Sequence, residues 1–116
     1  MTTDPNCIFC KIAAGTIPSI KLCEDAETLA FMDINPANDG HCLVIPKTHF
    51  PTLFALAPEA FAAAGRTVIK VAKAVQAALA PEGINLLQAN GPGAGQSVFH
   101  VHFHLLGGRN FAWPPG

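Results

Sequence analysis

The chain has 116 residues, of which 50% are hydrophobic and 13% are charged, and its formal net charge is −1. This length suits one domain with a single core, predicted over residues 1–116. The balanced charge argues against a nucleic-acid polymer or an anionic membrane surface as the main partner, since either would favour a basic patch. No apolar run approaches the length of a membrane span, and residues 1–6 lack the features of an export signal, so we expect a cytoplasmic protein.

The first half of the chain predicts a short helix and three strands. The opening amphipathic segment ends at Gly15 and is followed by Pro18, a combination typical of a helix terminus. Two β-type runs flank a polar turn, and a third run is closed by Pro46. In chain order we expect a helix over 8–14, strands over 20–23 and 28–33, a loop over 35–40 and a strand over 41–46.

The second half predicts one long helix between strands. Ala57, Pro58 and Glu59 suit a first helical turn, and Pro81 with Gly83 ends the helix. Apolar residues recur along it at helical spacing: Phe61, Val68, Val71 or Ala72, Val75 and Leu79. Next we expect a strand over 85–89, a glycine-rich loop over 90–96 and a strand over 99–106. The pattern predicts an α+β fold, with an antiparallel sheet of about five strands, one long helix and one short N-terminal helix.

Three histidines at alternate positions are the most informative feature of the chain. His100, His102 and His104 are separated by apolar residues, and strict alternation is typical of a half-buried β-strand. We therefore expect three imidazoles on one face of the last strand, roughly 6–7 Å apart along it. Imidazole can act as a nucleophile, an acid, a base or a metal ligand.

Three interpretations of these histidines compete. The first is a strand with solvent-facing histidines, which three histidines in register disfavour. The second is a zinc or iron site, although the sequence around this strand offers no carboxylate. The third is nucleophilic catalysis at phosphorus. The preceding loop, residues 90–97, favours the third, because its glycines let backbone amides approach a phosphate closely.

The four cysteines are expected to be free thiols or metal ligands in a reducing compartment. Cys23 and Cys42 lie in apolar, strand-like runs and are interpreted as core thiols. Cys7 and Cys10 have the spacing of half a four-coordinate zinc site, with a redox pair and two buried thiols as alternatives. The βαβ pattern expected around a thioredoxin-like redox pair is missing.

Residues 100–106 resemble the His-x-His-x-His-x-x signature, with x apolar, of the histidine triad (HIT) nucleotide hydrolases and transferases. The resemblance covers nearly the whole chain and includes residues 30–36, 43–47, 95–98 and 107–109. Residues 113–116 are similar to the end of the Hint branch, the histidine triad nucleotide-binding proteins, which include purine nucleoside phosphoramidases. The dinucleoside polyphosphate hydrolase branch has a different C-terminus.

The resemblance implies that His102 attacks the α-phosphorus of a nucleoside 5′-phosphoramidate or a related adenylate. The attack expels an amine, and water then converts a covalent nucleotidyl-histidine to a nucleoside monophosphate. By the same resemblance, His104 donates to a phosphate oxygen, Ser97 contacts the phosphate or the leaving group, and His100 completes the catalytic set. No metal is then required for catalysis, since loop amides and His104 stabilise the developing charge.

The resemblance also implies a site for a purine nucleotide, namely AMP, GMP or their phosphoramidates. Asp33 matches the acid that binds the ribose, and Asn90 with the backbone near Gly95 matches the phosphate contacts. The other residues that match the nucleotide pocket are Ile8, Phe9, Ile12, Phe31, Ile34, Gln96, Ser97 and Val98, of which the apolar ones before position 35 surround the base. A homodimer with a shared sheet is implied too, with Trp113 near the partner's site.

Some bacterial histidine triad proteins resemble this chain in having a cysteine pair, with a structural zinc completed by two histidines. The matching positions here are Cys7, Cys10, His49 and His100. If zinc is bound there, His100 braces the site and only His102 and His104 face the substrate. The sequence assigns no role to His41.

Two other functions are kept open. A zinc-dependent hydrolase that uses the ridge of His100, His102 and His104 as metal ligands would lose turnover on chelation. A nucleotide-binding or scaffold protein with incidental hydrolysis would bind a mononucleotide tightly and keep its cellular function after His102→Ala.

Overall fold

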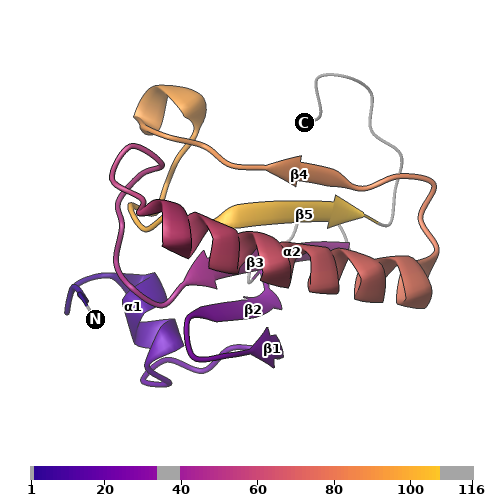
Figure 1. Cartoon of the computed structure of the whole chain (residues 1–116), viewed down its shortest axis with the longest axis horizontal. Coiled ribbons are helices and arrows are strands. Elements are labelled where there is room, and N and C mark those ends of the chain that lie inside the picture. Colours follow the sequence, from indigo (N-terminus) through magenta and orange to yellow (C-terminus); the bar gives the residue numbers. More distant parts are fainter. Residues whose placement is uncertain (1, 34–39, 108–116) are drawn as a thin grey trace.

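A computed structural model of the chain describes residues 2–33 and 40–107. In chain order its elements are α1 (Ile8–Ala13), β1 (Lys21–Glu24), β2 (Thr28–Met32), β3 (Gly40–Pro46), α2 (Pro58–Leu79), β4 (Asn85–Leu87), the 3₁₀ helix η1 (Pro92–Ala94) and β5 (Phe103–Gly107) (Figure 1). The strands form a five-stranded antiparallel sheet in the order β1-β2-β3-β5-β4. The predicted α+β fold is confirmed.

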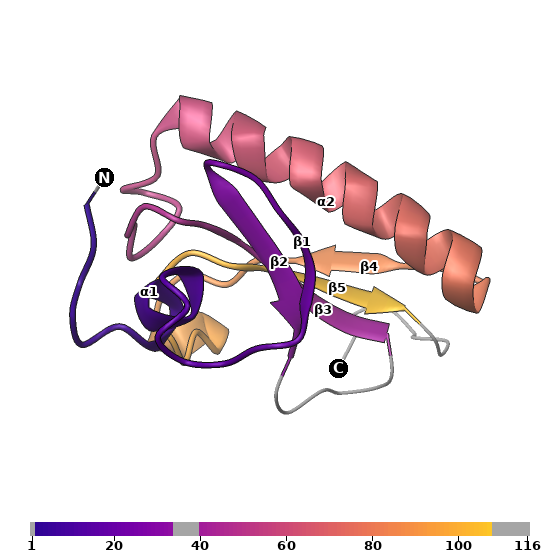
Figure 2. The same cartoon turned by 90° about the horizontal axis from the view of Figure 1, so that it is seen from below.

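The long helix α2 packs across one face of the sheet (Figure 2). The buried cluster on this side contains Ala30, Cys42, Val44, Ala64, Val68, Val71, Val75, Val101, Phe103 and Leu105. Val68, Val71 and Val75 belong to the predicted apolar stripe of the helix and are buried. The two end members of that stripe, Phe61 and Leu79, are instead 49% and 46% exposed.

The helix α1 packs on the opposite face. Its cluster contains Cys7, Phe9, Cys10, Ile12, Leu29, Phe31, Leu43 and Ile45. In the β3–β5 register Leu43 lies opposite His104, and side chains that are directly opposite share a face. The final strand therefore points apolar side chains toward α2 and His104 toward α1, as a period of two requires.

The last strand is shorter than predicted, because it begins at Phe103 rather than at residue 99. His100 lies in a bend, where its Nε2 donates to the carbonyl oxygen of Pro46 (2.7 Å). The amide of Val101 donates to the carbonyl oxygen of Phe50 (2.7 Å) rather than to a neighbouring strand. Side-chain alternation survives this departure, since Val101 still lies in the cluster that packs on α2.

The other elements follow the predictions with small shifts. β4 ends at Leu87 rather than at residue 89, and α2 ends where Ala80 adopts a left-handed φ of 44°, just before Pro81. Most of the loop expected over 35–40 falls outside the described residues. One domain over residues 1–116 stays a prediction. No helix in the described ranges is long and apolar enough to cross a membrane.

A sulfur atom caps the start of α1. Cys7 has an extended backbone at the N-cap position, and its Sγ accepts a hydrogen bond from the amide of Cys10 (3.4 Å). The preceding segment is tied to the same turn, because the amide of Cys7 donates to the carbonyl oxygen of Asp4 (3.1 Å). The amide of Asp4 in turn donates to Sγ of Cys10 (3.4 Å). These bonds hold residues 4–10 as one unit.

We predict that Gly40→Ala lowers the free energy of unfolding. Gly40 lies opposite Gly107, and a Cβ at position 40 would overlap the backbone carbonyl of Gly107, which cannot rotate away. Urea unfolding should show a loss of about 1–3 kcal/mol, the usual cost of overpacking. Gly65→Ala is the control: its Cβ would meet nothing within 4 Å, so the better helix former should stabilise by up to about 1 kcal/mol. Equal stability of the two variants would contradict the close approach of β3 and β5.

Candidate active site

A backbone carbonyl holds His102 in one tautomer. Nδ1 of His102 lies 2.8 Å from the carbonyl oxygen of His100, and because a carbonyl only accepts, Nδ1 carries the proton. The neutral ring therefore has its lone pair on Nε2. The ring of Phe9 packs edge-on against this imidazole, with the centroids 5.0 Å apart. Tautomer and ring plane are thus both constrained.

Burial keeps the histidines of the site neutral. It lowers the pKa of His102 below its usual range. It also lowers the pKa of His104 to about 4, and like-charge repulsion from His102 and His41 acts in the same direction. At neutral pH both rings therefore keep a lone pair, which is the form that can act as a nucleophile.

His41, to which the sequence assigned no role, lies against His104. Nε2 of His41 is 2.8 Å from Nδ1 of His104 and 3.2 Å from Oδ2 of Asp33. A proton on Nε2 of His41 suits both neighbours, because the carboxylate only accepts. Nδ1 of His104 is then the acceptor, and the proton of that ring lies on Nε2. His104 can thereby donate a hydrogen bond on the side away from His41.

Only the strand register could have revealed His41. In the β3–β5 ladder His41 lies opposite Leu106, which places it on the same face as His104 and one pair further along. The sequence contains a histidine at the start of a strand but no local signal for which strand lies beside it. Asp33, predicted as the ribose-binding acid, reaches this group of histidines through its contact with Nε2 of His41.

The glycine-rich loop is a compact turn built around a buried glutamine. Gly91 and Gly95 have φ values of 90° and 91°, which residues with a Cβ rarely adopt, and η1 lies between them. Oε1 of Gln96 accepts from the amide of Gly91 (2.7 Å), and its Nε2 donates to the carbonyl oxygen of Pro51 (2.7 Å). Gln96 therefore shapes the loop from inside, and the exposed Ser97 follows directly.

The side chain of Asn90 is engaged within the loops. Its Oδ1 accepts from the amide of Leu53 (2.6 Å), and its Nδ2 donates to Oε1 of Gln88 (2.7 Å). The structure thus shows Asn90 anchoring the loop, and its contact with a phosphate stays a prediction.

The residues predicted to surround the base divide into two groups. Phe9, Ile12 and Phe31 are buried in the cluster beneath α1, as expected of core residues. Ile8 is 40% exposed and reaches the surface. Ile34 lies outside the described residues, as does Trp113.

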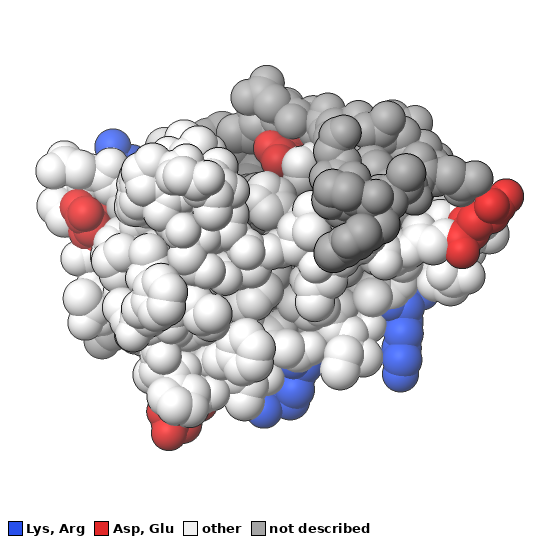
Figure 3. Space-filling model, turned by 90° about the horizontal axis from the view of Figure 1, so that it is seen from above, with Lys and Arg blue, Asp and Glu red and all other residues white. Residues whose placement is uncertain are grey.

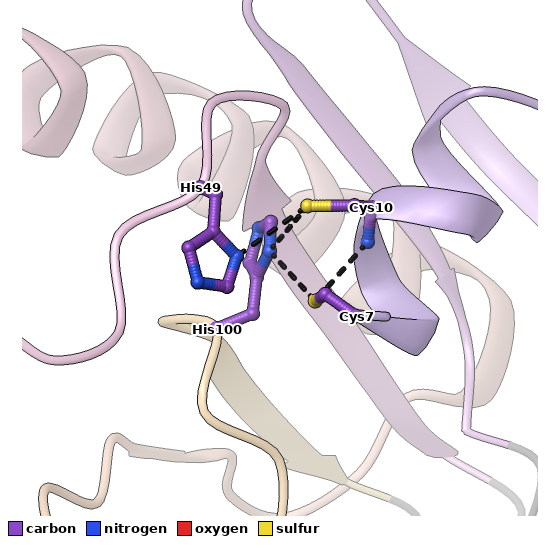
Figure 4. A group of neighbouring side chains, drawn as sticks. All are labelled: Cys7, Cys10, His49 and His100. Carbon is purple, nitrogen blue, oxygen red and sulfur yellow. Dashed lines mark hydrogen bonds between the residues drawn. The ribbon is translucent and has the colours of Figure 1, made fainter. Parts of the chain in front are cut away.

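The four side chains predicted as metal ligands converge at the start of α1 (Figure 4). Nδ1 of His100 lies 3.4 Å from Sγ of Cys7 and 3.5 Å from Sγ of Cys10. Nδ1 of His49 lies 3.4 Å from Sγ of Cys10. A tetrahedral zinc ion with bonds of about 2.3 Å to sulfur and about 2.0 Å to nitrogen would separate such atoms by about 3.5 Å. The donor atoms therefore fit a metal ion.

The surroundings of this cluster fit a metal as well. His100 is fully buried, its Nε2 donates to Pro46, and its Nδ1 consequently faces the two sulfurs. Burial lowers the pKa of His100 to about 4, so the ring is in the neutral form that ligates. Burial also raises the pKa of the Cys10 thiol, so a bound cation would displace a proton held there.

The three histidines of the predicted ridge belong to different groups. His100 turns toward the cysteines, whereas His104 joins His41 and Asp33, whose ligand atoms also lie within 4.8 Å of one another. Within the described ranges His102 joins neither group. One metal held by all three histidines is therefore disfavoured. The ring of His100 is enclosed, and its place in the catalytic set stays a prediction.

Charged side chains are sparse on one face of the molecule. Figure 3 shows lysine, arginine, aspartate and glutamate side chains scattered singly over the face seen there, with uncharged residues between them. This distribution agrees with the small formal net charge of −1.

The chain belongs to the HIT domain family, whose domain matches residues 14–111. Protein hit of Bacillus subtilis (strain 168) is 48% identical over 101 residues, which cover 87% of this chain and 70% of that protein. Adenosine 5′-monophosphoramidase hnt1 of Schizosaccharomyces pombe is 44% identical over 115 residues, covering 94% and 84%. A zinc-bound histidine triad family protein from Mycobacterium smegmatis has a crystal structure with a TM-score of 0.85 at 36% identity, covering 96% of this chain and 80% of that chain.

We predict that His41→Asn raises the pKa of His104. The substitution removes a histidine whose protonated form repels protonated His104, and it leaves Asp33, which attracts it. The pKa should rise from about 4 toward the ordinary value of 6.5, as followed by NMR titration of the imidazole signals. His49→Asn, in the other cluster, should leave it unchanged.

The same substitution should alter stability with the sign set by linkage. Because the folded pKa of His104 lies below the unfolded one, its contribution is present above pH 6.5 and is lost as the pH falls toward 4. His41→Asn should therefore lose less stability over this window than the wild type. An unchanged His104 titration would contradict the His41–His104 contact.

Proposed function

We propose that this protein hydrolyses nucleoside 5′-phosphoramidates, adenosine phosphoramidates and related adenylates in particular, through a covalent nucleotidyl-histidine. The observation that carries the proposal is the tautomer of His102, whose Nδ1 proton is held by the carbonyl of His100 while Nε2 keeps its lone pair. The relative from Schizosaccharomyces pombe that is named an adenosine 5′-monophosphoramidase supports the same class of substrate.

In the first step Nε2 of His102 attacks the α-phosphorus. A bond from Nε2 to phosphorus forms, and the bond from phosphorus to nitrogen breaks with its electron pair going to the nitrogen. The departing nitrogen takes a proton from solvent, relayed by the Ser97 hydroxyl, and leaves as an amine. His102 keeps its Nδ1 proton and becomes a positively charged adduct, which its bond to the His100 carbonyl stabilises.

In the second step a water molecule attacks the phosphorus of the adduct. The bond from phosphorus to Nε2 breaks, its electron pair returns to the ring, and the water gives up one proton to solvent, which restores the proton that the first step took. The products of the two steps are a nucleoside monophosphate and an amine. Dividing one displacement into two easier ones is the usual advantage of a covalent intermediate.

His104 stabilises the charge that develops on the phosphate. The contact with His41 places the His104 proton on Nε2, and this N–H donates to a phosphate oxygen. Asp33 holds the proton of His41 and, by resemblance, also binds the ribose hydroxyls. Asn90 and the amides near Gly95 help to hold the phosphate, Gln96 and Val98 complete the nucleotide site, and Ile8 belongs to the apolar wall around the base.

The Cys7, Cys10, His49 and His100 cluster holds a structural zinc ion in this proposal. The zinc supplies a cross-link between α1 and the two loops that carry the histidines, and no chemical step uses it. The donor spacing and the zinc-bound relative from Mycobacterium smegmatis support the assignment. His100 is then a positioning residue, which acts on substrate only through His102.

The remaining features of the proposal rest on the family resemblance. They are a cytoplasmic homodimer with a shared sheet, Trp113 near the partner's site, and AMP or GMP derivatives as ligands. The relative named for action on adenosine 5′-monophosphoramidate supports a purine nucleotide.

We predict that His102→Ala lowers kcat/KM for an adenosine 5′-phosphoramidate with a fluorogenic amine by at least about 10⁴-fold, because the nucleophile is removed. The variant should still bind AMP, as measured by calorimetry, and Lys73→Ala on the exposed side of α2 should keep full activity. Acid-quenched wild-type reactions should carry the nucleotidyl group on His102. Turnover by His102→Ala near the wild-type rate, or an adduct on another residue, would overturn the mechanism.

We predict about one zinc ion per chain in the purified protein, measured by plasma mass spectrometry. Cys7→Ser with Cys10→Ser should lose the zinc and lower the melting temperature, whereas Cys23→Ser, away from the cluster, should keep both. Exhaustive chelation should leave kcat of the folded protein within about fivefold, since the bond from His100 to Pro46 involves no metal. Turnover abolished by chelation and restored by zinc, in protein that stays folded, would identify a metal-dependent hydrolase instead.

A further inference from the structure

A cavity of about 300 Å³ lies between the N-terminal segment, the start of α1 and the chain that precedes β5. Ile8, Ser97 and Val98 line it, and these residues also belong to the proposed nucleotide site. Cys7 and His49 of the thiol cluster line it too, together with Asp4, Asn6 and Phe99, which have no role in the proposed reaction. The cavity therefore reaches Ser97, which meets the leaving group in the proposed reaction, and it has room for about ten water molecules.

Asp4 is the one acidic residue among the described residues that line this cavity, and none of them is a lysine or an arginine. Its Oδ1 accepts a hydrogen bond from the amide of Asn6 (2.9 Å). Among the described residues, no basic side chain forms an ion pair with it. The proposed zinc ion, with two thiolates and two neutral imidazoles, would add no net charge. The carboxylate of Asp4 therefore makes the electrostatic potential in the cavity negative.

The carboxylate has a fixed position. The backbone of Asp4 is bonded at both its amide and its carbonyl to the Cys7–Cys10 turn. Asp4 is also half-buried, which strengthens its interaction with a cation relative to a fully exposed pair. A fixed, partly desolvated charge in the lining of a cavity is suited to discriminating between ligands.

We propose that this cavity receives the leaving amine, and that Asp4 selects amines bearing a second, cationic nitrogen, as in an α,ω-diaminoalkane. The inference rests on the proposed function, in which Ser97 meets the leaving group. Ser97 connects the cavity to the proposed reaction, because it contacts the phosphate or the leaving group in that proposal and lines the cavity in the structure. The apolar side chains of Ile8, Val98 and Phe99 provide the contact surface for the methylene chain between the two nitrogens.

The test compares two matched substrates, adenosine 5′-phosphoramidates of 1,5-diaminopentane and of hexylamine. They differ only in an ammonium group that replaces a terminal methyl group. The wild type should favour the aminopentyl substrate about 2- to 5-fold in kcat/KM, the size expected of one partly exposed ion pair, and less at high salt. Asp4→Asn should bring the ratio close to one, with the hexyl substrate changed less than about twofold, and Asp4→Lys should invert it.

The controls separate a local charge effect from a structural one. Asparagine can still accept the hydrogen bond from Asn6, so the melting temperature and zinc content of Asp4→Asn should match the wild type. Glu59→Gln, which removes an exposed acid from the first turn of α2, should leave the substrate ratio unchanged.

A wild-type ratio near one, or the same ratio in Asp4→Asn as in the wild type, would overturn the role of Asp4 while turnover of both substrates upholds the proposed function. Failure to hydrolyse either substrate would instead remove the proposed function, and this inference with it.

Discussion

The arrangement of the site depends on one buried imidazole, that of His100. Its Nδ1 faces the sulfurs of Cys7 and Cys10, its Nε2 donates to Pro46, and its own carbonyl accepts from His102. Three segments far apart in the sequence therefore meet at a single residue. Shifting the chain here would leave a buried donor without its acceptor, at a cost of about 1–3 kcal/mol. This constraint also explains why the chain bends at His100 and enters the sheet only at Phe103.

The five histidines of the chain form two groups on either side of His102. His49 and His100 belong to the thiol cluster. His41 contacts both His104 and Asp33 through its Nε2. Burial lowers the pKa of His102 and of His104 and so keeps both rings uncharged at neutral pH, the form that suits a nucleophile and a hydrogen-bond donor. His104 lies on the α1 face of the sheet, opposite Leu43, and the cluster that packs on α2 covers the other face.

Prediction from the sequence succeeded where the signal was local. Alternation along 100–106 identified which side chains face the core, and helical spacing identified the buried side of α2. Contacts between segments were harder to predict. The cysteine cluster came from a family resemblance, and His41 was missed because its partner is set by the register of β3 on β5. Gln96 matched a binding residue, yet its side chain organises the loop from within, a role that depends on Pro51 far away in the sequence.

Cys7 combines two tasks that need different chemistry. As the cap of α1 it only has to accept a bond from the amide of Cys10, which serine, threonine, aspartate or asparagine do equally well. As a ligand of the proposed zinc ion it would have to supply a thiolate. One exchange at this position would therefore remove the proposed zinc while keeping the start of α1, and with it Phe9 beside His102. The fold could accordingly exist with or without that ion by a single substitution, without moving the histidine on which the site is built.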